Sequence, residues 1–201
     1  MTDLAARDRD HRIATRLGHL TKRSANQRND HRQATLTPVG AVARGLVAGG
    51  VGTAAMDTLL FARYHRHGGT SSAEEWELSN GLSAWDDAPA PAQVGKRLVE
   101  GLFEVKLPDT RARLVNNVTH WAFGMLSGIQ YGILAGSLPR RRIAYGLPFG
   151  VAVWATGYVV LPAAKLYQPI WKYDAKTLAN DLSAHLVYGL ATATALQLMS
   201  R

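Results

Sequence analysis

The sequence has no cysteine, and long stretches of it carry no charged residue. Without cysteine, the chain cannot form disulfides or thiolate metal sites. Aspartate, glutamate, lysine and arginine are all missing from residues 114–139, 143–164 and 182–200, which are intervals of 26, 22 and 19 residues. A helix crosses a bilayer with about 20 predominantly apolar residues. Each interval is therefore long enough to predict a membrane-spanning helix.

A further apolar stretch precedes these three and is interrupted by two charges, Arg44 and Asp57. A long arginine side chain can extend its charged end to the lipid surface, whereas an aspartate cannot reach that far. We predict an all-α, integral membrane four-helix bundle, with spans near 41–64, 114–136, 143–164 and 178–199. The alternative, a soluble helical domain, would have to cover more apolar helix than a chain of this size can bury.

The chain then divides into two parts, residues 1–40 and residues 41–201. The first is a polar, basic, cytoplasmic extension, and the second is the membrane domain with an outer loop over 65–113. Residues 1–37 contain no early apolar segment and no A-x-A cleavage site, so we expect no cleaved signal peptide.

The basic residues predict the orientation. Nine lysines and arginines occur up to Arg44, and the turn 137–142 (SLPRRR) adds three more. Cytoplasmic loops of membrane proteins carry an excess of these residues. With four spans, the N-terminus and this turn lie on the same side. We therefore predict a multi-pass protein of the bacterial cytoplasmic (inner) membrane, with both termini inside.

Two segments outside the spans have amphipathic helical patterns. In residues 8–24, apolar positions recur at helical spacing among basic side chains, which predicts a helix lying on anionic lipid. We do not expect nucleic-acid binding, because acidic residues dilute the charge and no aromatic residue interleaves it. In the outer loop, Ser72 and Glu75 form a predicted capping box. A second, interfacial helix is predicted to end before Pro108, with Val94 and Leu98 on its apolar face.

Small residues recur at every fourth position in the predicted spans. A membrane offers no hydrophobic drive for helix association, so such ladders allow close backbone packing instead. We predict this role for a set of nine glycines: Gly45, Gly49, Gly124, Gly128, Gly132, Gly136, Gly146, Gly150 and Gly189.

Continued toward the outer face, the ladders reach a polar cluster of five residues: Asp57, Asn116, His120, Asp181 and His185. Ionisable groups inside a membrane are costly and mark functional candidates by default. Three interpretations are open. The pairs could lock helices together, or they could respond to protons, because histidine titrates near neutral pH. They could also hold a metal or haem, although no E-x-x-H or thiolate pattern supports such a site.

Enzyme chemistry has little support in the sequence. The nucleophile-elbow, P-loop and dinucleotide-binding glycine motifs are all missing, and no nucleophile stands beside a base and an orienting acid. We predict no catalytic residues, no metal ligands and no cofactor.

Several short motifs resemble the YagU-like family of bacterial inner-membrane proteins. They are VTH at 118–120, GLPFG at 146–150, QPIWKYD at 168–174 and HLVYG at 185–189, together with Pro162. The resemblance implies a multi-spanning protein of unknown molecular function that is linked to acid-stress survival. It also places two residues of the cluster, His120 and His185, in matching motifs.

The sequence therefore favours a small membrane protein whose outer-side Asp/His cluster responds to pH. One alternative is an accessory subunit, or a homo-oligomer, that packs on a membrane complex through the glycine ladders. A haem- or metal-binding membrane protein is the other.

Overall fold

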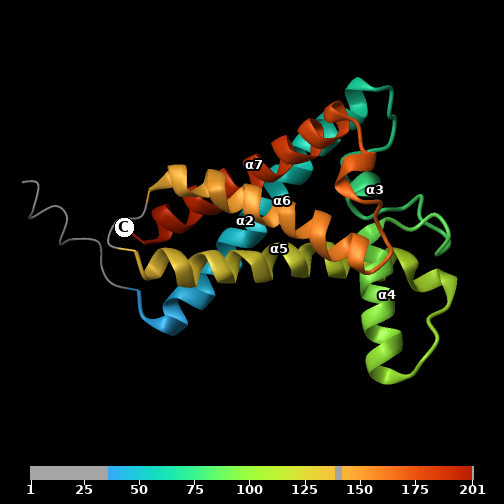
Figure 1. Cartoon of the computed structure of the whole chain (residues 1–201), viewed down its shortest axis with the longest axis horizontal. Coiled ribbons are helices and arrows are strands. Elements are labelled where there is room, and N and C mark those ends of the chain that lie inside the picture. The colour runs from blue at the N-terminus through green and yellow to red at the C-terminus, as the bar shows by residue number, and fades with distance from the viewer. Residues whose placement is uncertain (1–35, 139–141, 201) are drawn as a thin grey trace, which may run out of the picture. The chain divides into compact units, whose positions relative to one another are not determined.

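The structure is a computed structural model that describes residues 36–138 and 142–200. Residues 36–199 form one compact unit, and its described part consists of helices, short 3-10 turns and connecting loops, with no strand. The predicted all-helical fold is confirmed for this part. The lipid-surface helix predicted within residues 8–24 lies outside the described residues. With the labels of Figure 1, the elements are α2 (Pro38–Arg66), α3 (Ala73–Glu77), α4 (Ala90–Phe103), η1 (Asp109–Arg111), α5 (Ala112–Gly136), η2 (Ile143–Tyr145), α6 (Gly146–Ala163), η3 (Ile170–Lys172) and α7 (Ala175–Met199).

Three helical segments of the described chain are long and apolar enough to cross a membrane: Pro38–Arg66, Ile143–Ala163 and Ala175–Met199. Their mean hydropathies are 1.4, 1.5 and 1.2. The predicted span at 114–136 is not among them, although it forms the long helix α5. Its uncharged polar residues, including Asn116, His120 and Gln130, lower its hydropathy without adding a full charge. Absence of charge is therefore a weaker criterion than apolarity.

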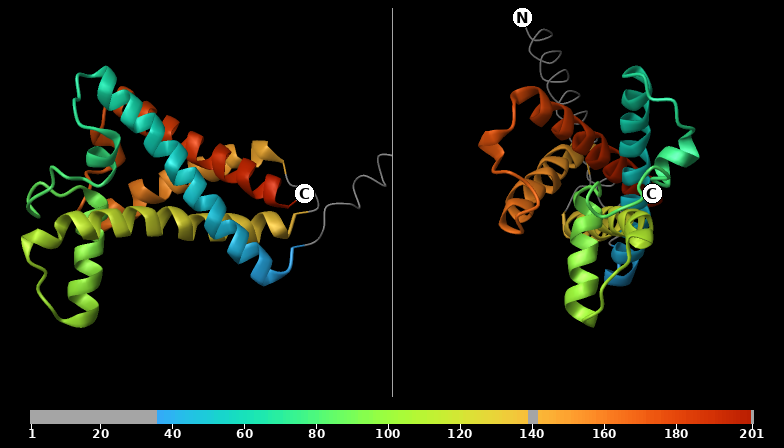
Figure 2. Two further views of the ribbon diagram at one scale, coloured as in Figure 1. Left: turned by 180° about the vertical axis from the view of Figure 1, so that it is seen from behind. Right: turned by 90° about the vertical axis from the view of Figure 1, so that its right-hand side faces the viewer.

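The α2 helix packs against both α5 and α7, and α6 packs mainly against α7 (Figures 1 and 2). The four long helices thus follow the spatial order α5, α2, α7, α6. Contact between α5 and α6 is slight, so the arrangement is more open between these two helices than a closed four-helix bundle would be.

The α2–α5 contact is made backbone to backbone by glycines. A Cβ added at Gly45 would lie 2.6 Å from the Gly128 carbonyl oxygen, and one at Gly49 would lie 2.9 Å from Gly128 Cα. Gly132 faces Gly45 and Ala41 in the same way. No side chain fits between the two helices along this stretch, because a Cβ added at any of these glycines would lie closer to the facing backbone than van der Waals distance.

The α6–α7 contact has the same character. A Cβ added at Gly189 would lie 2.8 Å from the Gly150 backbone nitrogen, and Gly146 faces Gly189 directly. Gly136 differs from the other eight predicted packing glycines. The nearest atom to a Cβ there would be the Ala41 Cβ at 3.6 Å, which is an ordinary contact. The last position of the ladder therefore leaves room for a side chain.

Side-chain caps mark several helix starts. Thr37 accepts a backbone hydrogen bond from the first turn of α2, and Ser72 and Glu75 form the predicted capping box of α3. The backbone and side chain of Thr177 donate to the Asp174 carboxylate before α7, and these bonds lower the pKa of Asp174. A carboxyl group whose pKa is lowered in the folded state stabilises that state at pH values above its ordinary pKa. This stabilisation is lost as the pH falls through the lowered pKa.

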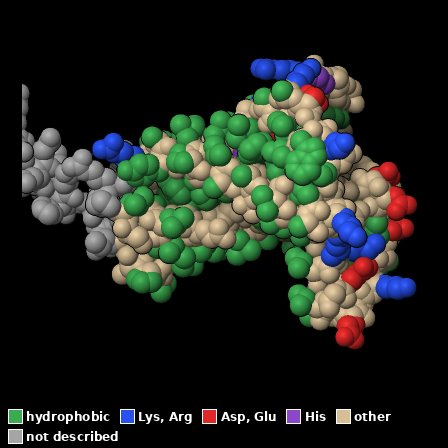
Figure 3. Space-filling view, viewed as in Figure 1, with side chains coloured by type: hydrophobic (Ala, Val, Ile, Leu, Met, Phe, Trp, Pro, Cys, Tyr) green, Lys and Arg blue, Asp and Glu red, His purple; other side chains and the backbone are tan. Residues whose placement is uncertain are grey.

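The α4 helix lies where the second helix of residues 65–113 was predicted, and its two sides differ in exposure. Ala92 and Gly95 are buried, and Gly95 lies against α5, whereas Leu98 and Leu102 on the other side are 55% and 74% exposed. In Figure 3, most charged side chains gather at the end of the unit that carries α4. The surface along the long helices on that face is almost wholly hydrophobic or uncharged, as expected of a membrane-embedded band.

Candidate functional site

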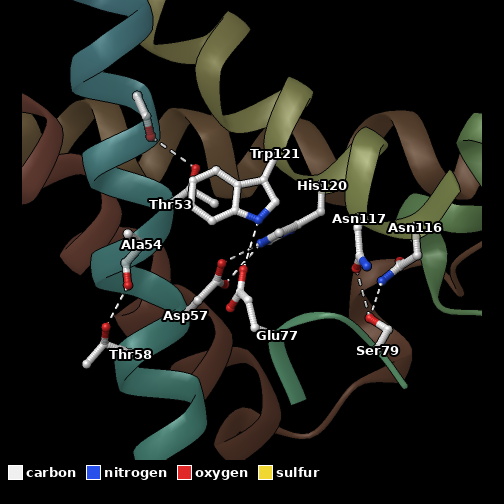
Figure 4. Close-up of polar contacts among 11 residues, drawn as sticks. Thr53, Ala54, Asp57, Thr58, Glu77, Ser79, Asn116, Asn117, His120 and Trp121 are labelled. Carbon is white, nitrogen blue, oxygen red and sulfur yellow. Dashed lines mark hydrogen bonds and ion pairs between the residues drawn. The ribbon is translucent and has the colours of Figure 1, made fainter. Parts of the chain in front are cut away.

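The central contact of the predicted polar cluster joins α2 to α5. Asp57 is only 5% exposed, and the His120 Nε2 lies 3.0 Å from each of its two carboxylate oxygens (Figure 4). One turn further into the unit, Thr53 packs against Gly124. The pair therefore continues the glycine contact between the same two helices. An imidazole N–H can donate to both oxygens, so the buried carboxylate has a hydrogen-bond partner.

The segment that follows α3 covers the first turns of α5. Ser79 donates to the Asn117 Oδ1 at 3.0 Å and accepts from the Asn116 Nδ2 at 2.9 Å. The Trp121 Nε1 donates to the Glu77 Oε1 at 2.8 Å (Figure 4). Asn116, predicted as a member of the polar cluster, thus bonds to Ser79, whereas Asp57 and His120 bond to one another. The role of Asn116 is to hold the loop on α5.

The second predicted pair lies within α7. The His185 Nδ1 is 3.4 Å from the Asp181 Oδ1 and 3.0 Å from the Asp181 carbonyl oxygen, which it can reach as the donor. Two aromatic residues of α6, Trp154 and Tyr158, lie beside the Asp181 carboxylate. This pair therefore couples α7 to α6, as the first pair couples α2 to α5.

Both pairs border one cavity of about 350 Å³ between the long helices. His120, Asp181 and His185 line it, and Asp57 reaches it only through His120. Its other walls come mainly from apolar and aromatic side chains of α2, α4, α5, α6 and α7. Clefts of this size, lined by apolar groups and a few polar ones, are typical of small-molecule sites.

An aromatic group closes the cavity toward the other end of the unit. The Phe149 ring lies 4.7 Å from that of Tyr131 and 5.8 Å from that of Tyr188. The Tyr188 hydroxyl donates to the Gly124 carbonyl oxygen at 2.7 Å. These contacts join α5, α6 and α7, and Tyr188 is also part of the cavity wall.

Metal binding gains no support from this geometry. In residues 36–138 and 142–200, no group of three or more histidine, aspartate or glutamate side chains is placed to hold a metal ion. Each pair offers one imidazole and one carboxylate, which is fewer than the four protein ligands of a structural zinc site.

The aromatic residues around Asp181 are the part of the site that sequence reasoning missed. Trp154 and Tyr158 lie four residues apart on α6, which was a readable signal for one helix face. Tyr167 and Tyr173 follow α6 in the chain, and their rings lie 5.8 Å and 5.5 Å from the Tyr158 ring.

The part of the chain that carries most of this site is similar to one family model. Residues 95–194 match the model of the family described as "Protein of unknown function (DUF1440)". The match runs from α4 to α7 and includes His120, Asp181 and His185, but α2 and Asp57 precede it. It supports an uncharacterised family and does not carry the YagU-like name. No curated protein and no solved structure matches the chain.

Proposed function

We propose that this protein crosses the bacterial cytoplasmic membrane four times, through α2, α5, α6 and α7. The support for α5 as a span is its register along α2. The contacts run in antiparallel order from Gly45 and Gly128, through Thr53 and Gly124, to Asp57 and His120. At 1.5 Å per residue, the 12 steps from Gly45 to Asp57 correspond to about 18 Å. A helix that accompanies α2 over this length crosses the membrane with it.

The orientation follows from the basic residues. The N-terminal extension and the 137–142 turn are rich in lysine and arginine, which favours a cytoplasmic position for both. The opposite ends of the helices, with both Asp/His pairs and α4, then face the exterior. A change in external pH would reach the pairs from that side.

We further propose that the outer end of the protein responds to acid through the Asp57–His120 contact. The observation that carries this proposal is the approach of His120 Nε2 to both oxygens of a buried carboxylate at 3.0 Å. Protonation of the imidazole gives a cation opposite this carboxylate. Charge-assisted hydrogen bonds are about twice as strong as neutral ones, so acidification tightens α2 against α5. Such a contact suits a membrane protein that must keep its structure in acid.

Other titratable groups surround the pair. The α3 helix contributes Glu77, which is held by Trp121 next to His120, and α7 contributes Asp181 and His185 at the shared cavity. The Arg63 guanidinium of α2 donates to the Ser183 hydroxyl of α7. His120 and His185 are the two histidines of the cavity wall, so both are included in the test.

The test is the pH dependence of stability in a mild detergent. When the protein is moved from pH 8 to pH 6, we expect the wild type to gain unfolding free energy relative to His120→Gln, because a charge-assisted hydrogen bond is stronger than a neutral one. The double variant His120→Gln/His185→Gln should show the smallest pH response. Thermal unfolding followed by circular dichroism at each pH measures this difference.

The matched control is His67→Gln, because His67 is exposed beyond the end of α2 and lies outside the cavity. It should keep the wild-type pH response. Parallel pH profiles for wild type and His120→Gln would refute the proposed acid response and leave a purely structural pair.

A further inference from the structure

The cavity has a polar end and an apolar body. Asp181 and His185 form the polar end with His120, whereas residues such as Met56, Phe123 and Val160 line the rest. Both α5 and α6 contribute to this body, and the contact between these two helices is slight. A molecule with an apolar chain could therefore enter from the bilayer between these helices.

The charged residues of the cavity wall indicate which polar head group such a molecule carries. Asp181 is the one carboxylate among the described lining residues, and no lysine or arginine of the described chain joins it there. Its side chain keeps 37% of its accessible surface, so it is not closed off by His185. A second carboxylate, Asp57, stands directly behind His120. The polar end is therefore complementary to a cation.

Aromatic rings surround this carboxylate. The Trp154 ring lies 5.0 Å from the Tyr158 ring, which in turn lies 5.8 Å from the Tyr167 ring, and all three residues line the cavity. Burial raises the pKa of the Tyr167 hydroxyl, and the nearby Asp181 charge raises it further. Aromatic faces attract cations, and aromatic sites are the usual means of binding quaternary ammonium groups.

We propose that the cavity binds an amphiphile with an alkylammonium head. The ammonium group sits at Asp181 among the rings of Trp154, Tyr158 and Tyr167, and the alkyl chain runs along the apolar body toward the gap between α5 and α6. The head could belong to a membrane lipid, such as a choline phospholipid, or to a free single-chain ammonium compound. The proposal is independent of the acid response, because it concerns Asp181 and the rings rather than the α2–α5 contact.

The test is a titration of the full-length protein in a non-ionic detergent with dodecyltrimethylammonium. Tryptophan fluorescence follows binding, because Trp154 lines the cavity, and native mass spectrometry counts the bound molecules. We expect saturable binding of one molecule, at least tenfold weaker in Asp181→Asn and in Tyr167→Leu. The controls are Asp109→Asn and Trp171→Leu, which remove an exposed carboxylate and an exposed ring outside the cavity. Both should bind as the wild type does.

A second arm distinguishes the two sources of the head group. The same variants are mixed with dioleoylphosphatidylcholine, and retained lipid is counted by native mass spectrometry. If Asp181→Asn lowers the retention of the phospholipid, the head group belongs to a lipid. If Asp181→Asn lowers only the binding of dodecyltrimethylammonium, the ligand is a free ammonium compound. Equal binding of dodecyltrimethylammonium to wild type and Asp181→Asn, with circular dichroism showing both folded, would overturn the proposal. Equal affinity for uncharged dodecanol would overturn it as well.

Discussion

Replacing Gly128 with leucine is expected to be among the most damaging single changes in the chain. Gly128 lies where α2 and α5 touch through their backbones, and Gly45 and Gly49 are both in direct contact with it. A leucine there has no space, so the two helices must separate along their whole contact. Overpacking costs about 1–3 kcal/mol and occasionally more, and we expect the upper end because backbone cannot move aside as a side chain can. Thermal unfolding in mild detergent measures the loss.

Gly136→Leu is the matched control for this change. Gly136 belongs to the same fourfold ladder on the same helix, but a Cβ there meets the Ala41 side chain at 3.6 Å. We expect its melting temperature to stay within a few degrees of the wild type. Equal destabilisation of the two leucine variants would contradict the packing role of Gly128, because leucine raises helix propensity at both positions and only Gly128 lies in the close α2–α5 contact.

Truncating His120 to alanine is expected to have the second large effect. It leaves the Asp57 carboxylate, which is 5% exposed, without its imidazole partner. A buried polar group that loses its hydrogen-bond partner costs about 1–3 kcal/mol, and more when it is charged. We therefore expect a loss of about 3 kcal/mol for this buried carboxylate.

A double-mutant cycle separates this coupling from other losses. His120→Ala leaves the Asp57 carboxylate buried without its partner, and Asp57→Asn removes that carboxylate. The double variant should therefore lose less unfolding free energy than the two single variants lose together. The cycle is measured at pH 6 by thermal unfolding. Strict additivity of the single effects would show that the two side chains do not depend on one another.

The glycine contacts and the polar pair were within reach of sequence reasoning because they follow one rule. Residues four apart lie on neighbouring turns of one helix face, so the ladder through Gly45, Gly49 and Thr53 leads to Asp57. The structure places each of these opposite α5. The rule drifts over several turns, which is why Gly136, at the end of the ladder, leaves the close contact.

Other features depended on packing between helices that no local pattern encodes. The slight contact between α5 and α6 is one such feature, and the ring contacts among Tyr158, Tyr167 and Tyr173, which join α6 to the loop after it, are another. Predicting the membrane spans also required the mean hydropathy of each segment, and not only a count of its charged residues. The α2 helix qualifies as a span despite Asp57, whereas α5 falls short because of its uncharged polar residues.

In the proposed topology, α5 crosses the membrane and the polar pairs lie on the outer side. Because the natural chain lacks cysteine, single cysteines at Ser83, Ser137 and Gln168 can be labelled in whole cells with a membrane-impermeant maleimide. With four spans and an inner N-terminus, Ser83→Cys and Gln168→Cys react from outside, and Ser137→Cys reacts only after permeabilisation. Labelling of Ser137→Cys from outside, with Gln168→Cys protected, would show that only α2, α6 and α7 cross and would contradict the account.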